Sequence, residues 1–396
     1  MKLKFGILVS CLLIWSGQLA ASSPQLSGSS VTSFLGYKTE SAHTNFFQQV
    51  TLGYRPKAAK NISVHVNLMG LTDLGPEKVK TPFQVYGAYV DWNRLLKNHV
   101  DLSLGRKFYF NGVGVGYLDG AFLSIRPAKK VSVAIFGGVE VPYDRSAKIY
   151  RLQDGYIFGG KIEAKRILGT RLGVSFYQKV RSNSAYWQLV GMNVSRAFGR
   201  SIFWNTRVSF NLLESTLQKA LVNLRWLPTS KLLFYVEGFY RKPHIYHDSF
   251  FQRFELNALT QGRFNTVYYF SKKYGLTGDL LWIQSEEKQA QKIRLGVLTP
   301  YGIIGFQQDL GAAGFQTRLY ADASYVLTSG LKARLLLDFS NYQISDWSES
   351  YIQVGSAFRL DYQINKKFLV ALEDQFNNNR LYKVDNRILG QVLCRF

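Results

Sequence analysis

The sequence has no long hydrophobic run, very little cysteine and comparatively few acidic residues. Its longest apolar stretch, Phe5–Trp15, is shorter than the roughly 18 residues of a membrane-crossing helix, which excludes a polytopic helical membrane protein. Two cysteines, Cys11 and Cys394, are too few for a disulfide framework or a cysteine metal site. Asp and Glu number 26 against 49 Lys and Arg, so the formal net charge is +23.

Aromatic residues, in contrast, are abundant. The chain has 28 Phe, 24 Tyr and 7 Trp, yet its mean hydropathy is only −0.09. A disordered chain would contain fewer apolar and aromatic residues, and the 34 Gly and 9 Pro follow no collagen-like period. Many aromatics without a long apolar run indicate segments in which apolar and polar residues alternate.

The first residues predict a secretory signal peptide. Lys2 and Lys4 precede the apolar stretch, and the small residues Ala20–Ser23 follow it. We expect residues 1–22 to be the signal and residues 23–396 to form one domain. The alternative is a lipoprotein signal, because Leu8–Cys11 fits a lipobox, but the apolar stretch continues beyond Cys11.

Period-2 alternation recurs through the rest of the chain in segments of about 9–13 residues, the length of a tilted membrane-spanning strand. The clearest segment, residues 202–212, has one apolar face and one mixed face. The first face is Ile202, Trp204, Thr206, Val208, Phe210 and Leu212, and the second is Phe203, Asn205, Arg207, Ser209 and Asn211. Residues 292–298, 317–325, 331–340 and 352–362 repeat the pattern.

Short and long connections alternate between these segments, as in outer-membrane barrels. The sequence therefore predicts an all-β protein, a transmembrane antiparallel up-and-down β-barrel of about 22 strands, within a range of 18 to 22. A soluble β-sandwich, propeller or β-helix would also alternate, but no repeat of fixed period is present. Aromatics at segment ends suit the girdles at membrane interfaces.

The C-terminal segment carries a resemblance to a known family. Residues 387–396 end on Phe396, and Ile388, Val392, Cys394 and Phe396 share one face. The chain resembles bacterial outer-membrane β-barrels of the porin-like kind, in which the barrel assembly machinery reads the final strand and its terminal Phe. This implies an assembly signal at Gly390, Val392, Cys394 and Phe396, although Cys394 stands where that family usually has an aromatic.

A second, shorter likeness lies in residues 104–120. Leu104-Gly105-Arg106 is followed by a glycine-rich stretch and by Asp119-Gly120, an arrangement similar to that in several porin and alginate-export-like barrels. Residues 107–116 are a candidate for an inward-folded constriction loop, with Gly112, Gly114, Gly116 and the nearby Asp119 as its candidate residues. The alternative is an ordinary surface loop. Residues 242–254 are a second candidate.

On the predicted strands, the face that carries the polar residues is mostly basic. Fourteen Lys and Arg share it with five Asp and Glu, and a pore lined by one sign of charge favours counter-ions. We expect a water-filled, anion-preferring channel for passive diffusion of small hydrophilic solutes. The basic residues expected to line the pore are Arg207, Arg225, Lys292, Arg294, Arg318, Lys332, Arg334 and Arg359.

Three alternatives stay open at this stage. Cross-strand ion pairs would turn the basic residues into structural ladders. Aromatic side chains of lumen parity, such as Tyr177, Tyr235 and Tyr320, would suit a selective channel or exporter for an acidic saccharide. Apolar residues of the same parity would suit a filled, structural or adhesive barrel; these are Leu233, Leu281, Leu336 and Leu389.

No enzyme is expected. The nearest approach to a catalytic or metal motif is His244, His247 and Asp248 in one presumed outer loop, which is weak for zinc and lacks a nucleophile. We expect no cofactor, no metal and no nucleic acid, and no plug domain before the first strand. The expected location is the outer membrane of a Gram-negative bacterium. The expected partners are its lipids and lipopolysaccharide, the assembly machinery and small anionic or polar solutes, with the oligomeric state left open.

Overall fold

The computed structural model describes residues 25–396 apart from 39–41, 75–81, 244–256, 287, 313, 345–348 and 381–383. Alternating branched and aromatic side chains favour extended backbone, and most of these residues lie in 22 strands. The first eleven are β1 (Leu26–Lys38), β2 (Ala42–Tyr54), β3 (Ile62–Asp73), β4 (Phe83–Arg94), β5 (Val100–Asn111), β6 (Gly114–Ala128), β7 (Val131–Glu140), β8 (Tyr156–Ile167), β9 (Thr170–Arg181), β10 (Ser184–Phe198) and β11 (Ile202–Asn211). The others are β12 (Thr216–Thr229), β13 (Leu232–Arg241), β14 (Leu259–Tyr269), β15 (Gly275–Ser285), β16 (Lys288–Thr299), β17 (Gly302–Gly311), β18 (Phe315–Val326), β19 (Leu331–Gln343), β20 (Tyr351–Gln363), β21 (Phe368–Asn378) and β22 (Asp385–Arg395).

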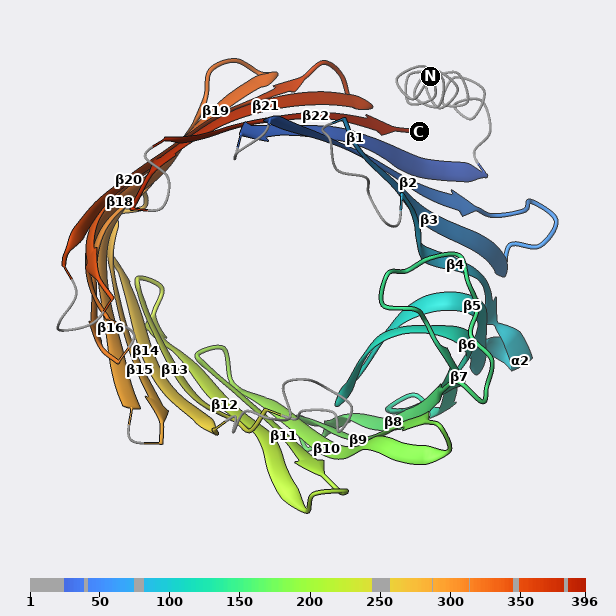
Figure 1. Cartoon of the computed structure of the whole chain (residues 1–396). Helices are drawn as coiled ribbons and strands as arrows, with labels where there is room; N and C mark the ends of the chain where they lie inside the picture. Colours follow the sequence, from blue (N-terminus) through green and yellow to red (C-terminus); the bar gives the residue numbers. More distant parts are fainter. Residues whose placement is uncertain are drawn as a thin grey trace.

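The sheet closes on itself. Each strand pairs antiparallel with the next along the chain, and β22 pairs with β1, where Leu35 stands opposite Leu389. Beyond the ladder, Gly28 N–H donates to the carbonyl of Phe396 at 2.8 Å. The predicted up-and-down barrel of about 22 strands is therefore confirmed, and Figure 1 shows it along its axis.

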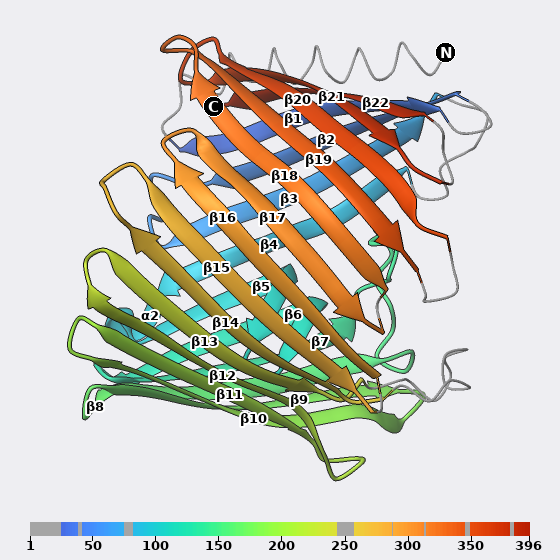
Figure 2. The same ribbon diagram turned by 90° about the vertical axis from the view of Figure 1, so that its left-hand side faces the viewer.

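The two rims of the barrel differ. The rim that carries both ends of the sheet has tight turns, such as the one at Leu168 and Gly169, which both have positive φ. It also holds the single helical turn in the described residues, α2 (Leu95–Asn98). Within the described chain no helix is long and apolar enough to cross a membrane. The opposite rim carries longer connections, including residues 141–155, and the strands run obliquely between the rims (Figure 2).

The outer and inner faces have opposite chemistry. In β19, Leu335, Leu337 and Phe339 are exposed on the outside, whereas Asp338 and Ser340 alternate with them on the inside. An apolar outer band and a polar interior are typical of a barrel that sits in lipid and encloses water.

One hairpin leaves the wall. β4 pairs with β5 only from Ala88 to Trp92, and the last third of β5 continues without that neighbour. The connection 141–155 takes its place beside β4, where Val85 N–H donates to the carbonyl of Arg145 at 2.8 Å. The far ends of β5 and β6 bend into the barrel interior (Figure 1).

Glycines allow this bend. Gly105 in β5, Gly120 in β6 and Gly138 in β7 stand opposite one another in register. Gly105 has φ +122°, and a Cβ there would lie 2.3 Å from the carbonyl oxygen of Ala88. A Cβ on Gly120 would lie 2.1 Å from the carbonyl oxygen of Gly137, so only glycine permits these strands to approach so closely.

The bent hairpin packs its inner face against the inner wall of β7–β10. A small buried core forms there from Tyr109, Leu118, Phe136, Ile157, Tyr177 and Leu189. The Tyr109 and Tyr177 hydroxyls lie 3.1 Å apart, and their rings stack. Burial of these side chains holds the hairpin inside the barrel.

Candidate functional site: the inner wall of the barrel

The eight basic residues expected to line the pore all occupy the inner-facing register. The strand pairings connect them in one alternating set; Arg294, for example, stands opposite Gln307, which stands opposite Arg318. Their neighbours of opposite parity, such as Leu295 and Leu335, are exposed on the outside. The inner wall is therefore the candidate functional surface.

Five of the eight form ion pairs with carboxylates. Lys292 Nζ lies 2.9 Å from Asp309, and Arg334 lies 2.6 Å from Asp322. Arg359 contacts both Asp361 and Glu373. The other two pairs are Arg294 with Asp279 and Arg318 with Asp338. These cross-strand ladders offset the charge of each cation locally.

Sequence reasoning missed many of the acidic partners. The inner register also holds Asp91, Asp101, Glu140, Asp279, Asp309, Glu373 and Asp385, all in ion pairs. Asp279 shows why these acids were missed. Leu281 and Ile283 lie on the same face of its strand, so the segment does not alternate clearly between polar and apolar residues. Several of their cationic partners, such as Lys107, Lys179 and Arg263, were also missed, so the ratio of fourteen to five overstated how far basic residues outnumber acidic ones on the wall.

Arg207 and Arg225 differ from these five paired cations. Together with Lys219 and Arg241 they form a group on β11–β13, here called the basic patch, in which no cation lies within 4 Å of a carboxylate of the described residues. Lys219 stands directly opposite Arg241, and Arg207 opposite Leu221. Glu237, the nearest inner-facing acid in register, accepts a hydrogen bond from the Tyr235 hydroxyl.

Lys332, the eighth residue, occupies an intermediate position. It stands opposite Asp361 in the ladder, while Asp361 itself bonds to Arg359.

Two of the three tyrosines expected to face the pore already pack against other groups. Tyr177 is buried under the hairpin, and Tyr320 lies beneath the Arg318 guanidinium.

The glycine-rich stretch is a hairpin rather than the expected loop. β5 runs to Asn111 and β6 begins at Gly114, so Gly114, Gly116 and Asp119 lie in a strand and Gly112 in the tight turn. A Cβ on Gly112 would meet Ser175 Oγ at 2.4 Å, and one on Gly114 would meet the Tyr177 ring at 2.3 Å. The tip therefore lies directly against the inner wall of β9.

Asp119 has a different position, at the base of the bend. It forms a two-pronged ion pair with Arg106, at 2.8 and 2.7 Å, and both side chains are nearly buried. Arg106 also donates to the carbonyls of Ser146 and Lys148. The Gly-Arg and Asp-Gly elements of the sequence thus fasten the hairpin to the connection 141–155.

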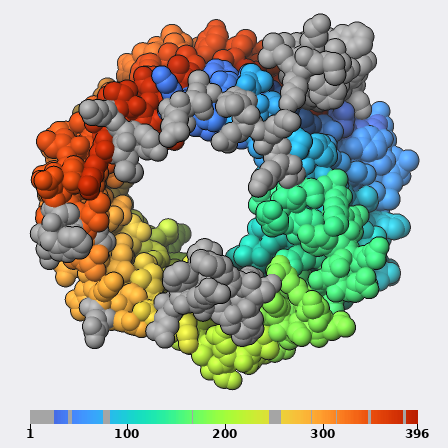
Figure 3. Space-filling model, in the orientation of Figure 1, coloured from blue at the N-terminus to red at the C-terminus, as the bar shows by residue number. Residues whose placement is uncertain are grey.

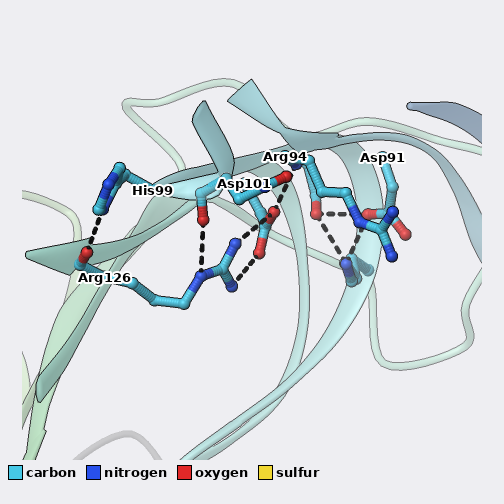
Figure 4. A network of polar contacts seen from close by, with 8 residues as sticks. Asp91, Arg94, His99, Asp101 and Arg126 are labelled. Carbon is cyan, nitrogen blue, oxygen red and sulfur yellow. Dashed lines mark hydrogen bonds and ion pairs between the residues drawn. The ribbon is translucent and has the colours of Figure 1, made fainter. Parts of the chain in front are cut away.

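A second polar network closes the turn at α2, near the foot of the same hairpin. Arg126 forms a fork with Asp101, whose Oδ1 also accepts the backbone N–H of Arg94 at 2.8 Å (Figure 4). His99 Nδ1 lies 2.7 Å from the carbonyl oxygen of Arg126. The two networks hold the hairpin to the barrel at its foot and at its bend.

The residues of the expected assembly signal lie at the seam. Val392 is exposed on the outside, Cys394 is a free thiol in the same row, and Gly390 lets the Phe34 ring approach. Phe396 packs its ring near Gly28 and closes the ladder to β1. The residues His244, His247 and Asp248, and the signal segment 1–22, lie outside the described residues.

The described residues leave the barrel open along its axis. Figure 3 shows the passage in space-filling form, narrowed on the side of β5–β7 and the connection that follows β7. The inner wall therefore combines an open passage, a largely neutralised ladder, one basic patch and one inward hairpin.

Comparisons with known proteins agree with this architecture. No protein-family model matches the chain, and no curated protein matches its sequence. Among solved structures, the translocation pore of the P pilus usher PapC aligns with a TM-score of 0.56 and 7% identity, over 93% of this chain and 99% of that chain. The siderophore receptor PirA from Acinetobacter baumannii aligns with a TM-score of 0.60 and 7% identity, over 94% and 81%.

Pseudomonas aeruginosa OpdQ is also similar, with a TM-score of 0.44 and 12% identity over 94% of this chain and 98% of that chain. At such identities the likeness concerns the fold. This chain has the fold of a closed antiparallel β-barrel, as its sequence predicted.

Proposed function

We propose that the protein is an outer-membrane channel through which small hydrophilic solutes diffuse passively, with a preference for anions. The apolar outer face suits lipid and the polar interior suits water. The open passage in Figure 3 supports conduction rather than a filled, purely structural barrel. Residues 1–22 serve as the export signal and the strand that ends at Phe396 as the assembly signal.

The basic patch carries the proposal. Arg207, Lys219, Arg225 and Arg241 face the interior from three adjacent strands and have no carboxylate partner among the described residues. Charges that lie beside a low-dielectric wall produce a field that concentrates counter-ions. Preference for anions therefore arises at this patch and not from the basic residues of the whole wall.

Single-channel current across a planar bilayer tests the proposal. Purified, refolded protein under a KCl gradient should conduct steadily, with a reversal potential that reports greater permeability for chloride than for potassium. The preference should weaken between 0.1 M and 1 M salt, because the Debye length falls from about 10 Å to about 3 Å.

Circular dichroism provides the control for folding. Folded protein that conducts with a potassium preference would refute the role of the patch while leaving the channel. Folded protein without any conductance would refute the channel itself.

A further inference from the structure

An aromatic ring of the inward hairpin lies against the basic patch. The Arg207 guanidinium sits over the Phe110 ring, 5.7 Å from its centroid. Phe110 is 62% exposed, and Val115, opposite it in the ladder, is 60% exposed. The hairpin tip packs on β9 with its other face, so these two apolar side chains project into the passage.

A second aromatic ring borders the same patch from the wall. Lys219 Nζ lies 5.5 Å from the centroid of the Phe239 ring. Two adjacent rows of the ladder bring the groups together: Arg207, Leu221 and Phe239 in one row, and Ser209, Lys219 and Arg241 in the next. We call Phe110, Arg207, Lys219, Phe239 and Arg241 the aromatic shelf.

The chemistry of the shelf is specific. Three cations without carboxylate partners among the described residues attract an anionic group, and hydrogen bonds to charged groups are the stronger kind. Exposed aromatic and aliphatic side chains remove apolar surface of a ligand from water. A hydrated inorganic anion uses only the cations, whereas an organic anion with an apolar body uses both parts.

Two other places on the wall strands where a ring and a cation are neighbours differ from the shelf. Tyr320 also lies beneath an arginine, but that arginine, Arg318, is bonded to Asp338. Phe203 faces the interior beside Arg225 without a ring from the hairpin. The hairpin is thus what completes the shelf.

We propose that the aromatic shelf is a selective binding site for small amphipathic organic anions, such as carboxylates with an aromatic or aliphatic body. This inference rests on the proposed channel function and adds the substrate class. A solute that binds weakly at the narrowed part of the passage is concentrated there and permeates faster than one of equal size and charge that does not.

Phenylacetate and gluconate provide the test, because both are monovalent carboxylates while only phenylacetate has an apolar body; the ratio of their free mobilities corrects for the larger size of gluconate. Reversal potentials under opposed gradients of their sodium salts give the permeability ratio of the two anions. The wild-type protein should favour phenylacetate, and Phe110→Ser should lower that ratio about fivefold, the scale of one well-placed aromatic contact.

Phe203→Ser is the matched control, because it removes an inner-facing ring outside the shelf. It should leave the ratio unchanged, and Phe239→Ser should lower it even if Phe110→Ser folds poorly. Chloride preference in KCl should persist in all three variants. Two outcomes would overturn the shelf while leaving the anion channel intact. The first is a wild-type permeability ratio no higher than the ratio of the free mobilities of the two anions. The second is an equal permeability ratio in the wild-type protein, Phe110→Ser and Phe239→Ser. Loss of chloride preference in the wild-type protein would instead refute the channel proposal.

Discussion

Two neighbouring arcs of the inner wall use the same residue types to opposite effect. In the ladder arc, β14–β22, seven inner-facing cations lie within 4 Å of a carboxylate, and Lys332 is an exception; the seven are Arg263, Lys292, Arg294, Arg318, Arg334, Arg359 and Arg387. In the patch arc, β11–β13, Arg207, Lys219, Arg225 and Arg241 have no such partner among the described residues.

Register accounts for part of the difference, although Arg334 also stands opposite Arg359 in the ladder arc, where each of the two has its own carboxylate partner. Lys292 stands directly opposite Asp309, and Arg294 opposite Asp279. In the patch arc, Arg207 stands opposite Leu221, and Lys219 opposite Arg241, which places like charges side by side. Because like charges that face each other across strands destabilise a sheet, the arrangement costs stability. A role of the uncompensated charge in transport would explain why this destabilising arrangement is present.

Reversing charge in the patch arc should have the largest effect. Arg207→Glu together with Lys219→Glu should lower the ratio of chloride to potassium permeability about tenfold or more, the lower end of the effect expected of a one-sign cleft. Reversal potential in a KCl gradient measures the ratio. An unchanged ratio in folded protein would mean that the two arcs do not differ in function.

A larger residue at the hinge of the hairpin should have the next largest effect. Gly120→Val places side-chain atoms where a Cβ already lies 2.1 Å from a backbone oxygen, so the free energy of unfolding should fall by about 1–3 kcal/mol. The hairpin should also move away from the patch arc, which should reduce the preference for phenylacetate over gluconate.

Urea titration of the liposome-inserted protein measures the first effect and reversal potential the second. Gly238→Val on β13 is the control, because nothing lies within 4 Å of a Cβ at that position. Equal losses in the two variants would argue against a hinge at Gly120.

Removing a complete pair from the ladder arc should have the smallest effect. Arg334 and Asp322 are 46% and 36% exposed, so Arg334→Gln with Asp322→Asn should change the free energy of unfolding by about 0–1 kcal/mol. The permeability ratio should stay at its wild-type value, because both charges disappear together. The single Arg334→Gln variant should instead shift it toward potassium, since Asp322 is then uncompensated.

Much of the fold could be predicted from the sequence. Alternation in residues 202–212 and 331–340 assigned the inner and outer faces correctly, because a period of two in an extended strand leaves no other arrangement. The strand count followed from the number of such segments. Residues 107–116 were harder, since exposed apolar side chains such as Phe110 give no alternation between lipid and water.

The candidate site could be predicted only in part. The parity of Arg207 and Arg225 placed them on the inner wall, but parity does not say which cations have acidic partners. That depends on which residue of the neighbouring strand stands opposite, and a shift of one residue would exchange every partner.

The sequence by itself determined a closed antiparallel barrel with a polar interior, because the alternation of side chains along each strand is a local property of the chain. Only the tertiary structure decided where positive charge stays uncompensated and where Phe110 lies. Arg207 and Phe110 are almost a hundred positions apart by their residue numbers, and a bend at Gly105 and Gly120 brings them together. Contacts of this kind arise from strand register and from the packing of a hairpin on the opposite wall, which no local pattern records.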